Sequence, residues 1–314
     1  MKLVSVEQMI TLEKEANAGG LLYDQMMRNA GFALAGVIHE NFWANQEKRI
    51  VGLIGSGNNG GDALIALGEL SKKGWKVSAY LVKERDPDDA LVLQLEQMNC
   101  NVIQSGEDPK HSKLFKLIEK SDLILDGILG TGVKLPLKPD VSDILKAISK
   151  IDKKPITVAV DCPSGVDCEN GEAAEETLYA DLTVCMAAVK AGLLKFPAFE
   201  FIGKLIVVDI GLPPNLPGFS QTQSVVVDHH MAKALLPDRP LNAHKGTFGK
   251  CMVVGGSVNY CGAVVLAAQS AYKIGAGLVC AAIPGSIYDA IAGQVPECVW
   301  VMLPDSVGVI NSNA

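Results

Sequence analysis

Three short loops combine glycine or proline with side chains that carry oxygen atoms. They are Gly57-Asn58-Asn59-Gly60-Gly61-Asp62, Asp126-Gly127-Ile128-Leu129-Gly130-Thr131-Gly132 and Asp161-Cys162-Pro163-Ser164-Gly165. A carboxylate held near a reacting atom can act as a general acid or base. Carboxylate, amide and hydroxyl oxygens are also hard ligands for cations. Three such loops in one chain favour a polar functional site over isolated turns.

Each loop follows a short apolar run that is typical of a buried parallel strand, over 50–54, 122–126 and 156–160. The carboxyl ends of parallel strands meet at one edge of a sheet. In open α/β folds, ligands bind at that edge, where the strand order reverses. We therefore expect the three loops to converge on one crevice.

The first loop also fits the dinucleotide-binding fingerprint G-x-G-x-x-G at Gly55, Gly57 and Gly60. A predicted helix over 61–73 places Asp62 in its first turn. A carboxylate there repels phosphate and competes for the free N–H groups. We therefore expect the loop to bind hydroxyls, an amide or a cation instead of a pyrophosphate.

Strands alternate with helices along the chain. Helical periodicity predicts helices over 5–16, with Ser5 and Gln8 as a capping box, and over 23–42. Strands are then expected at 50–54, 76–82, near 102, 122–126, 156–160, 182–186 and 204–209, with helices at 61–73, 87–98, 111–120 and 139–150. This alternation predicts an α/β fold with a mostly parallel sheet and helices on both faces.

A stretch dense in proline and glycine at 209–218 predicts a domain boundary. We expect a first domain over 1–218 and a second α/β segment over 224–314. In the second segment the pattern predicts helices at 229–236, 262–274 and 285–292, with strands at 251–254 and 277–283.

Composition excludes several classes of protein. The net charge of −7 argues against nucleic acid as the main partner. The sequence has no run of about 18 apolar residues that would span a membrane, and its first residues lack the apolar core of a signal peptide. Eight scattered cysteines indicate buried thiols and a cytoplasmic location more than disulfides or zinc.

The three loops resemble the signatures of the YjeF N-terminal family, the NAD(P)H-hydrate epimerases. Two further stretches resemble the family's downstream pattern, Lys190-Ala191-Gly192-Leu193-Leu194 and Asp209-Ile210-Gly211-Leu212-Pro213. The resemblance covers residues 5–215. It implies a Rossmann-like three-layer sandwich that interconverts the R and S forms of NADHX or NADPHX, reduced nicotinamides that have gained water at C6.

Residue by residue, the resemblance implies substrate contacts at Asn58, Asn59, Gly60, Gly61 and Asp62, at Gly130, Thr131, Gly132, Val133, Lys134, Leu135 and Pro136, and at Asp161. It implies a potassium ion at Asn59, Asp126 and Ser164, and a homo-oligomer. We expect Asp161 to be catalytic, moving a proton along a water-loss or ring-opening route.

Two residues of the matched region leave alternatives open. Cys162 is interpreted as a small buried residue in place of the family's aliphatic one, with a nucleophile as the alternative. Lys190 precedes an alanine where the family usually has proline. It either faces the substrate or is a solvated or structural lysine.

The second segment resembles the opening of the ADP- or ATP-dependent NAD(P)H-hydrate dehydratase, a ribokinase-like domain. The match rests on 244–250, 253–257, 262–263 and 275–279, with Ala263 at a substrate-contact position. The family's nucleotide loop and its G-x-G-D aspartate lie further on than residue 314. We therefore expect this chain alone to lack dehydratase activity.

Two other functions remain as alternatives. The first is a binding or scaffold module of the same fold, although a scaffold has no need of this polar cluster. The second is an NAD-dependent dehydrogenase, with Lys83 and Glu84 near the position of a ribose-binding acid. No His or Tyr arrangement for hydride transfer accompanies them.

Overall fold

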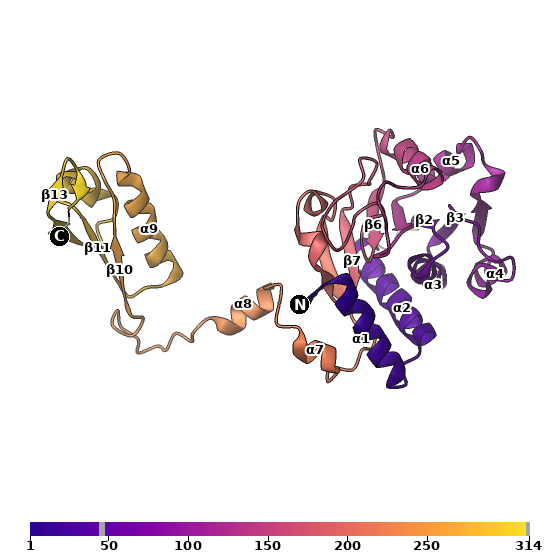
Figure 1. Cartoon of the computed structure of the whole chain (residues 1–314), viewed down its shortest axis with the longest axis horizontal. Helices are drawn as coiled ribbons and strands as arrows, with labels where there is room; N and C mark the ends of the chain where they lie inside the picture. The colour runs from indigo at the N-terminus through magenta and orange to yellow at the C-terminus, as the bar shows by residue number, and fades with distance from the viewer. Residues whose placement is uncertain (44–47, 312–314) are drawn as a thin grey trace. The chain divides into compact units, whose positions relative to one another are not determined.

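The computed structural model describes residues 1–43 and 48–311. Residues 44–47 and 312–314, which fall within the two predicted domains, lie outside the described residues. The chain divides into two compact units, Met1–Met231 and Ala232–Ala314 (Figure 1). Each unit is described by itself.

The first unit extends beyond the predicted boundary at 218, because the start of the chain binds the segment that follows it. The backbone N–H of Leu3 donates to the carbonyl of Ser224 at 3.1 Å, and that of Val226 donates to the carbonyl of Met1 at 2.8 Å. The short helices α7 (Pro217–Gln221) and α8 (His229–Leu235) lie in this region. The stretch dense in proline and glycine at 209–218 therefore precedes the end of the first compact unit, which extends to Met231.

A seven-stranded parallel sheet forms the centre of the first unit. Its strands lie in the order β4 (Asn101–Gln104), β3 (Lys76–Leu81), β2 (Arg49–Ile54), β5 (Leu123–Gly127), β6 (Ile156–Val160), β7 (Leu182–Met186) and β9 (Lys204–Val208). The chain starts in the middle at β2, builds outward to β4, and returns to β5 on the other side. The order in which strands are added therefore reverses between β2 and β5, although the two strands run parallel, and the predicted α/β architecture is confirmed.

Helices cover both faces of this sheet (Figure 1). One layer is formed by α1 (Val6–Ala18), α2 (Tyr23–Phe42), α3 (Asn58–Lys72) and α4 (Ala90–Gln97), and the other by α5 (Ser112–Lys120) and α6 (Pro139–Ser149). Alternate residues of β2 serve the two cores: Ile50 and Ile54 pack in the first, Val51 and Leu53 in the second. The predicted three-layer sandwich is confirmed, as is the capping box of Ser5 and Gln8.

A two-stranded parallel pair ties the start of the chain to the region after β7. Strand β1 (Leu3–Val4) pairs with β8 (Val189–Lys190), with Val4 opposite Lys190. Three 3-10 helices belong to the first unit, η1 (Ser105–Glu107), η2 (Ala191–Leu194) and η3 (Ala198–Glu200). The pairing places α1, which follows β1, against the same end of the sheet as β8.

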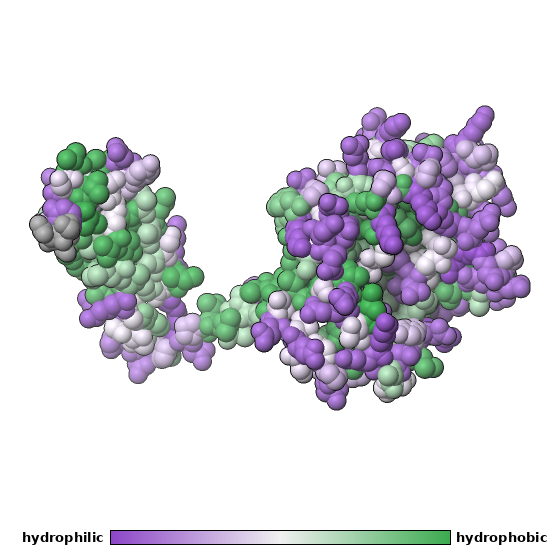
Figure 2. Space-filling view, in the orientation of Figure 1, coloured by the Kyte–Doolittle hydropathy of each residue, from purple (hydrophilic) through white to green (hydrophobic). Residues whose placement is uncertain are grey.

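The second unit contains a smaller parallel sheet of β10 (Lys250–Val254), β11 (Leu278–Pro284) and β12 (Val299–Leu303). Helix α9 (Cys261–Ile274) packs against it through Val264, Val265 and Ala268. Apolar side chains such as Met252 and Val254 remain exposed, and Figure 2 shows apolar surface gathered over this unit. The predicted α/β pattern is present, and its ribokinase-like identity stays a prediction.

The helix predicted over 285–292 is broken into three short turns, η4 (Gly285–Ile287), α10 (Tyr288–Ile291) and η5 (Ala292–Gln294). A two-residue hairpin of β13 (Asp305–Ser306) and β14 (Val309–Ile310) follows β12.

None of the helices in the described part of the chain has the length and apolar character that crossing a membrane requires. All eight cysteines are free thiols. Four of them are buried and the other four are partly exposed, so the expectation of buried thiols holds for half of them.

Candidate active site

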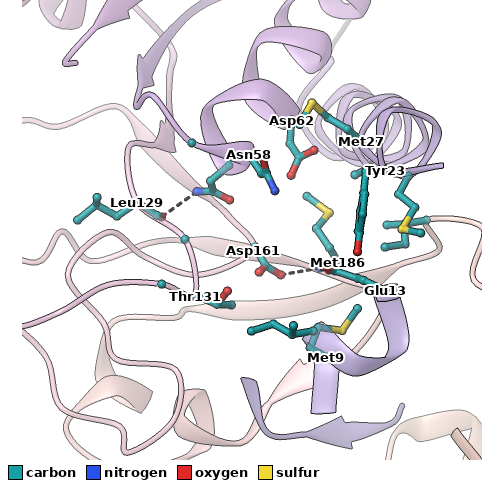
Figure 3. A pocket seen from close by; sticks show the side chains of 18 of the residues that line it. Met9, Glu13, Tyr23, Met27, Asn58, Asp62, Leu129, Thr131, Asp161 and Met186 are labelled. Atoms are coloured by element: carbon teal, nitrogen blue, oxygen red, sulfur yellow. Dashed lines mark hydrogen bonds between the residues drawn. The ribbon is translucent and has the colours of Figure 1, made fainter. Parts of the chain in front are cut away.

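A cavity of about 490 Å³ opens at the carboxyl ends of β2, β5 and β6. Helices α1 and α2 supply its other wall. Eight of the residues expected to bind substrate line it: Asn58, Asn59, Asp62, Gly130, Thr131, Gly132, Val133 and Asp161. Figure 3 shows Asp62 and Asp161 pointing into the same space, with Met9, Tyr23 and Met27 around them. The three loops thus meet at the reversal point of the sheet.

Other expected residues lie outside the cavity lining. Gly60 and Gly61 are buried in the first turn of α3. Leu135 and Pro136 line a second, more open hollow, and Lys134 is exposed and lines neither. Ala263 is exposed in α9, in the second unit.

Helix α3 begins at Asn58, three residues earlier than the sequence predicted, with Gly57 as its N-cap. Asp62 therefore lies in the second turn, and the first turn contains no acidic residue. The predicted place of Asp62 in the first turn was wrong, so the argument against phosphate at this helix end loses that premise. Gly60 argued against helix by propensity, but it allows close packing: a Cβ there would lie 2.1 Å from the carbonyl oxygen of Gly55.

The first and second loops touch through their backbones at Gly55. Its N–H donates to the carbonyl of Gly127 at 3.1 Å, and a Cβ there would lie 1.9 Å from the carbonyl oxygen of Ile128. We expect Gly55→Ala to lower the free energy of unfolding by about 3 kcal/mol, a fall in Tm of roughly 6–12 °C. Gly57→Ala is the matched control, because nothing lies within 4 Å of its added Cβ. Equal losses of Tm in the two variants would contradict this.

A buried polar network joins the second loop to the third. Asp126, at the end of β5, is 1% exposed. Its carboxylate accepts from the Oγ of Ser164 at 2.5 Å and from the N–H of Ser164 at 2.8 Å. The Oγ of Ser164 accepts from the N–H of Leu129 at 2.9 Å, and the amide of Asn59 donates to the carbonyl of Leu129 at 2.8 Å. The structure thus brings Asn59, Asp126 and Ser164 together.

Burial raises the pKa of Asp126, although hydrogen bonds from Ser164 and Ile128 oppose the change. No lysine, arginine or histidine of the described chain forms a salt bridge with it. An ionised carboxylate in such a place is costly without a counter-charge. Two of the groups that contact this carboxylate are the backbone N–H groups of Ser164 and Ile128. The Ser164 hydroxyl, the Leu129 carbonyl and the Asn59 amide oxygen belong to the same network, so its oxygen atoms can serve as ligands for an alkali cation.

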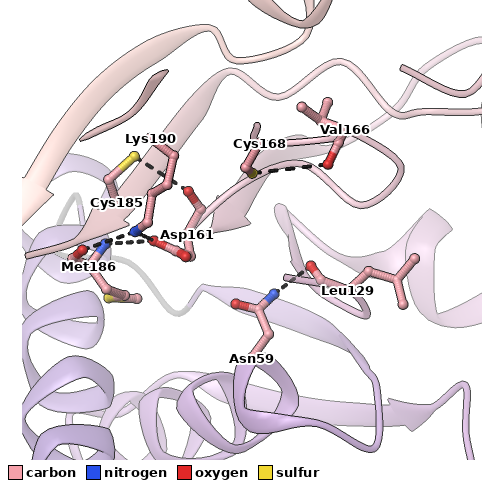
Figure 4. A network of polar contacts seen from close by, with 8 residues as sticks. All are labelled: Asn59, Leu129, Asp161, Val166, Cys168, Cys185, Met186 and Lys190. Atoms are coloured by element: carbon pink, nitrogen blue, oxygen red, sulfur yellow. Dashed lines mark hydrogen bonds and ion pairs between the residues drawn. The ribbon is translucent and has the colours of Figure 1, made fainter. Parts of the chain in front are cut away.

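Asp161 is held in a left-handed conformation with φ of 64°. Its Oδ1 accepts from the N–H of Met186 at 2.8 Å and from the ammonium of Lys190, which also donates to the carbonyl of Met186 at 3.0 Å (Figure 4). Burial disfavours the charged lysine, but the neighbouring Asp161 carboxylate outweighs it and raises the pKa of Lys190. Lys190 lines the cavity and is 1% exposed, so it is a buried ion-pair partner and not a solvated lysine.

The thiol of Cys162 is fully buried. A hydrogen bond with Cys168, together with burial, raises its pKa. Since the thiolate is the nucleophilic form, this environment supports the interpretation of Cys162 as a packing residue.

Two more carboxyl groups face the cavity, from α3 and α1. Burial, and then repulsion from Asp161 and Glu13, raises the pKa of Asp62 well above its ordinary range. Burial also raises the pKa of Glu13, with the ammonium of Lys190 opposing the change. No side-chain hydrogen bond holds Asp62 among the described residues. Asp62 therefore keeps its proton to a higher pH than an exposed carboxyl group does.

The raised pKa of Asp62 makes folding stability depend on pH. The folded state keeps this proton to higher pH than the unfolded state, so stability is lost as pH rises from about 3.8 through the raised value. Asp62→Asn cannot ionise, so we expect its Tm to exceed that of the unaltered protein above this window. Thermal melts between pH 4 and pH 8 measure the difference. Asp143→Asn, at an exposed position of α6, is the control and should keep the original slope.

Sequence reasoning missed several residues of the site. Glu13 lies four positions after buried Met9 and so shares the apolar face of α1. A carboxyl group on that face could have indicated a residue of the site. Arg85 fastens the first loop, because its Nη1 donates to the carbonyl of Gly55 at 2.7 Å while its Nε binds Asp89 at 2.6 Å. Nothing in the local pattern marked Arg85.

The chain is similar to one known protein family and to curated proteins that share one name. A family model described as "YjeF-related protein N-terminus" matches residues 23–192. The chain is 31% identical to the "Bifunctional NAD(P)H-hydrate repair enzyme Nnr" of Dictyoglomus turgidum, over 99% of this chain and 60% of that protein. It is 33% identical to the protein of the same name from Archaeoglobus fulgidus, over 95% of this chain and 59% of that one.

The crystal structure of the yeast protein YNL200c matches with a TM-score of 0.56 and 23% identity, over 66% of this chain and 87% of that one. This likeness concerns the fold. The chain spans about 60% of the length of the two curated relatives described.

Proposed function

The chain belongs to the family of YjeF-related protein N-termini, and on that basis we propose that its first unit is an NAD(P)H-hydrate epimerase. Its substrates are the R and S forms of NADHX and NADPHX, in agreement with the names of its relatives. The observation that carries the proposal is the cavity in which Asp161, fixed by Lys190 and Met186, faces the buried carboxyl of Asp62, whose pKa is raised.

The chemistry that this site supports is proton transfer at the hydroxylated ring carbon. On a water-loss route, the C6–O bond breaks as the hydroxyl oxygen takes a proton, and the lone pair of the ring nitrogen replaces the lost electrons. Water then attacks C6 from the other face and returns a proton to the site. On a ring-opening route the Asp161 carboxylate takes the hydroxyl proton and passes it to the ring nitrogen, while the C6–N bond breaks and a C6 carbonyl forms; the ring then closes on the other face by the reverse steps. On the water-loss route the carboxyl group of Asp62 gives the departing hydroxyl its proton, Asp161 takes a proton from the attacking water, and that proton returns to Asp62 through water in the cavity.

Chromatographic separation of R- and S-NADHX tests the proposal. Starting from one pure epimer, we expect the protein to bring the two to equilibrium faster than the spontaneous rate. Equilibration at the spontaneous rate with folded protein would favour the binding-module alternative.

We propose that potassium occupies the network of Asn59, Asp126 and Ser164, whose hydroxyl, amide and carboxylate oxygens support this assignment. In the described chain no cluster of three or more His, Cys, Asp or Glu side chains is arranged for a metal. A cation here would be held largely by neutral oxygens, as suits a monovalent ion.

Exchange of potassium for choline is expected to lower the Tm of the unaltered protein. An ion present at about 100 times its dissociation constant stabilises the folded state by about 2.7 kcal/mol. Asp126→Asn keeps the side-chain shape but removes the charge, so its Tm should be the same in both salts. A variant that still responds to potassium would place the ion elsewhere.

For the second unit we propose a part of an ADP- or ATP-dependent dehydratase, with Ala263 near its substrate. We keep the prediction that this chain alone does not dehydrate NADHX. Recovery of NADH absorbance when (S)-NADHX and ADP are added would refute it. A homo-oligomer and a cytoplasmic location are likewise proposals, the latter supported by the eight free thiols.

A further inference from the structure

The charges around the cavity are unevenly divided. The acidic lining residues are Glu13, Asp24, Asp62 and Asp161, and the cationic ones in the described chain are Lys83 and Lys190. Lys190 is 1% exposed and already bound to Asp161, so it cannot turn to an incoming anion. Among the described lining residues, Lys83 is therefore the cation that a dissolved anion can meet.

Lys83 lies at the opposite side of the cavity from the reacting end. It follows β3, whereas Asp161 follows β6, and β2 and β5 lie between these strands. Three strand spacings separate the two positions by about 14 Å across the sheet. A dinucleotide whose nicotinamide lies at Asp161 extends across this distance and carries its phosphates toward Lys83.

The ammonium of Lys83 is paired with the carboxylate of Asp140, in the first turn of α6. The hydrogen bond from Lys83 lowers the pKa of Asp140, so the carboxylate is ionised. The two side chains are 25% and 50% exposed. A pair so exposed contributes little to stability, so a better anion can displace Asp140 at small cost.

The start of α3 favours an anion near the same place. The helix begins at Asn58 without a side-chain cap and without an acidic residue in its first turn. Gly57 and Asn58 both line the cavity, at the end of β2 next to β3. Free N–H groups at a helix start attract negative charge, which adds to the effect of Lys83.

We propose that Lys83 binds a phosphate group of the dinucleotide and that Asp140 is the internal competitor which the phosphate displaces. The choice of ligand rests on the proposed function, but the binding step does not depend on catalysis. Removal of Lys83 and removal of Asp140 therefore change ligand affinity in opposite directions.

Titration of the protein with NADH and with NADPH, followed by nicotinamide fluorescence, tests this. We expect Lys83→Gln to weaken binding by roughly ten-fold, the effect of one charge-assisted hydrogen bond. Asp140→Asn frees Lys83 and should tighten binding by about two- to five-fold. The double variant should bind like Lys83→Gln. An effect on both ligands assigns the pyrophosphate, and an effect on NADPH alone assigns the 2′-phosphate; either supports the proposal.

Glu107→Gln and Lys113→Gln are the matched controls, because they remove another surface ion pair, at 3.6 Å, that does not line the cavity. Shifts of the same sign in Lys83→Gln and Asp140→Asn, shifts no larger than those of the controls, or no binding of either ligand by the unaltered protein would overturn the proposal. Opposite shifts without epimerisation would refute the epimerase and leave the phosphate site standing. Epimerisation without these shifts would refute the phosphate site and leave the epimerase standing.

Discussion

Asp161→Asn is expected to slow the epimerisation of NADHX by about 10²- to 10⁴-fold, the range that a positioned acid–base group supplies. The amide can still accept a hydrogen bond from Met186, but it cannot take or return a proton. Initial rates of interconversion of purified R and S epimers measure the effect. A variant within a few-fold of the unaltered rate would remove Asp161 from the chemistry.

Loss of activity in this variant needs a control for folding, because Asp161 also neutralises Lys190. The double variant Asp161→Asn with Lys190→Met removes both charges and keeps similar side-chain volumes. We expect it to recover most of the lost stability and none of the lost activity. Recovered activity would show that Asp161 acts only by holding Lys190.

The two single variants of this ion pair should differ strongly in stability. Asp161→Asn leaves the ammonium of Lys190, 1% exposed, without its counter-charge, and we expect it to lower the free energy of unfolding by about 3–5 kcal/mol. Lys190→Met leaves the carboxylate of Asp161, which is 13% exposed and borders the cavity, where water can solvate it. Lys190→Met should therefore lower the free energy of unfolding by less than Asp161→Asn does.

Urea denaturation of both variants measures this difference. We expect the unaltered protein to have the highest urea midpoint, Lys190→Met a lower one, and Asp161→Asn the lowest. The reverse order of the two variants would mean that the carboxylate, not the ammonium, is the group that the fold cannot leave unpaired.

The central sheet and the meeting of the three loops could be predicted from the sequence, because both follow from local rules. Apolar runs separated by amphipathic helices require a parallel sheet, and parallel strands bring the loops after β2, β5 and β6 to one edge. The bounds of α2 followed from helical periodicity alone.

The start of α3 and the burial of Lys190 could not be predicted, because both depend on contacts between distant parts of the chain. The start of α3 was misplaced because Gly60 has poor helix propensity, whereas its missing Cβ is what allows the close approach of the Gly55 backbone. The state of Lys190 depends on Asp161 and on burial beneath the start of the chain. No local pattern contains this information.

The pairing of β1 with β8 has a consequence for the order of events during synthesis. Leu3 and Val4 are made among the first residues, but their partners Val189 and Lys190 come near the end of the first unit. Such non-local contacts form slowly, because the intervening chain must first be brought together. On the ribosome, β1 therefore has no strand partner until β8 has emerged, and the cavity wall that α1 supplies is fixed only after that point. Synonymous codon changes that slow translation before residue 190 would prolong this interval without altering the folded protein.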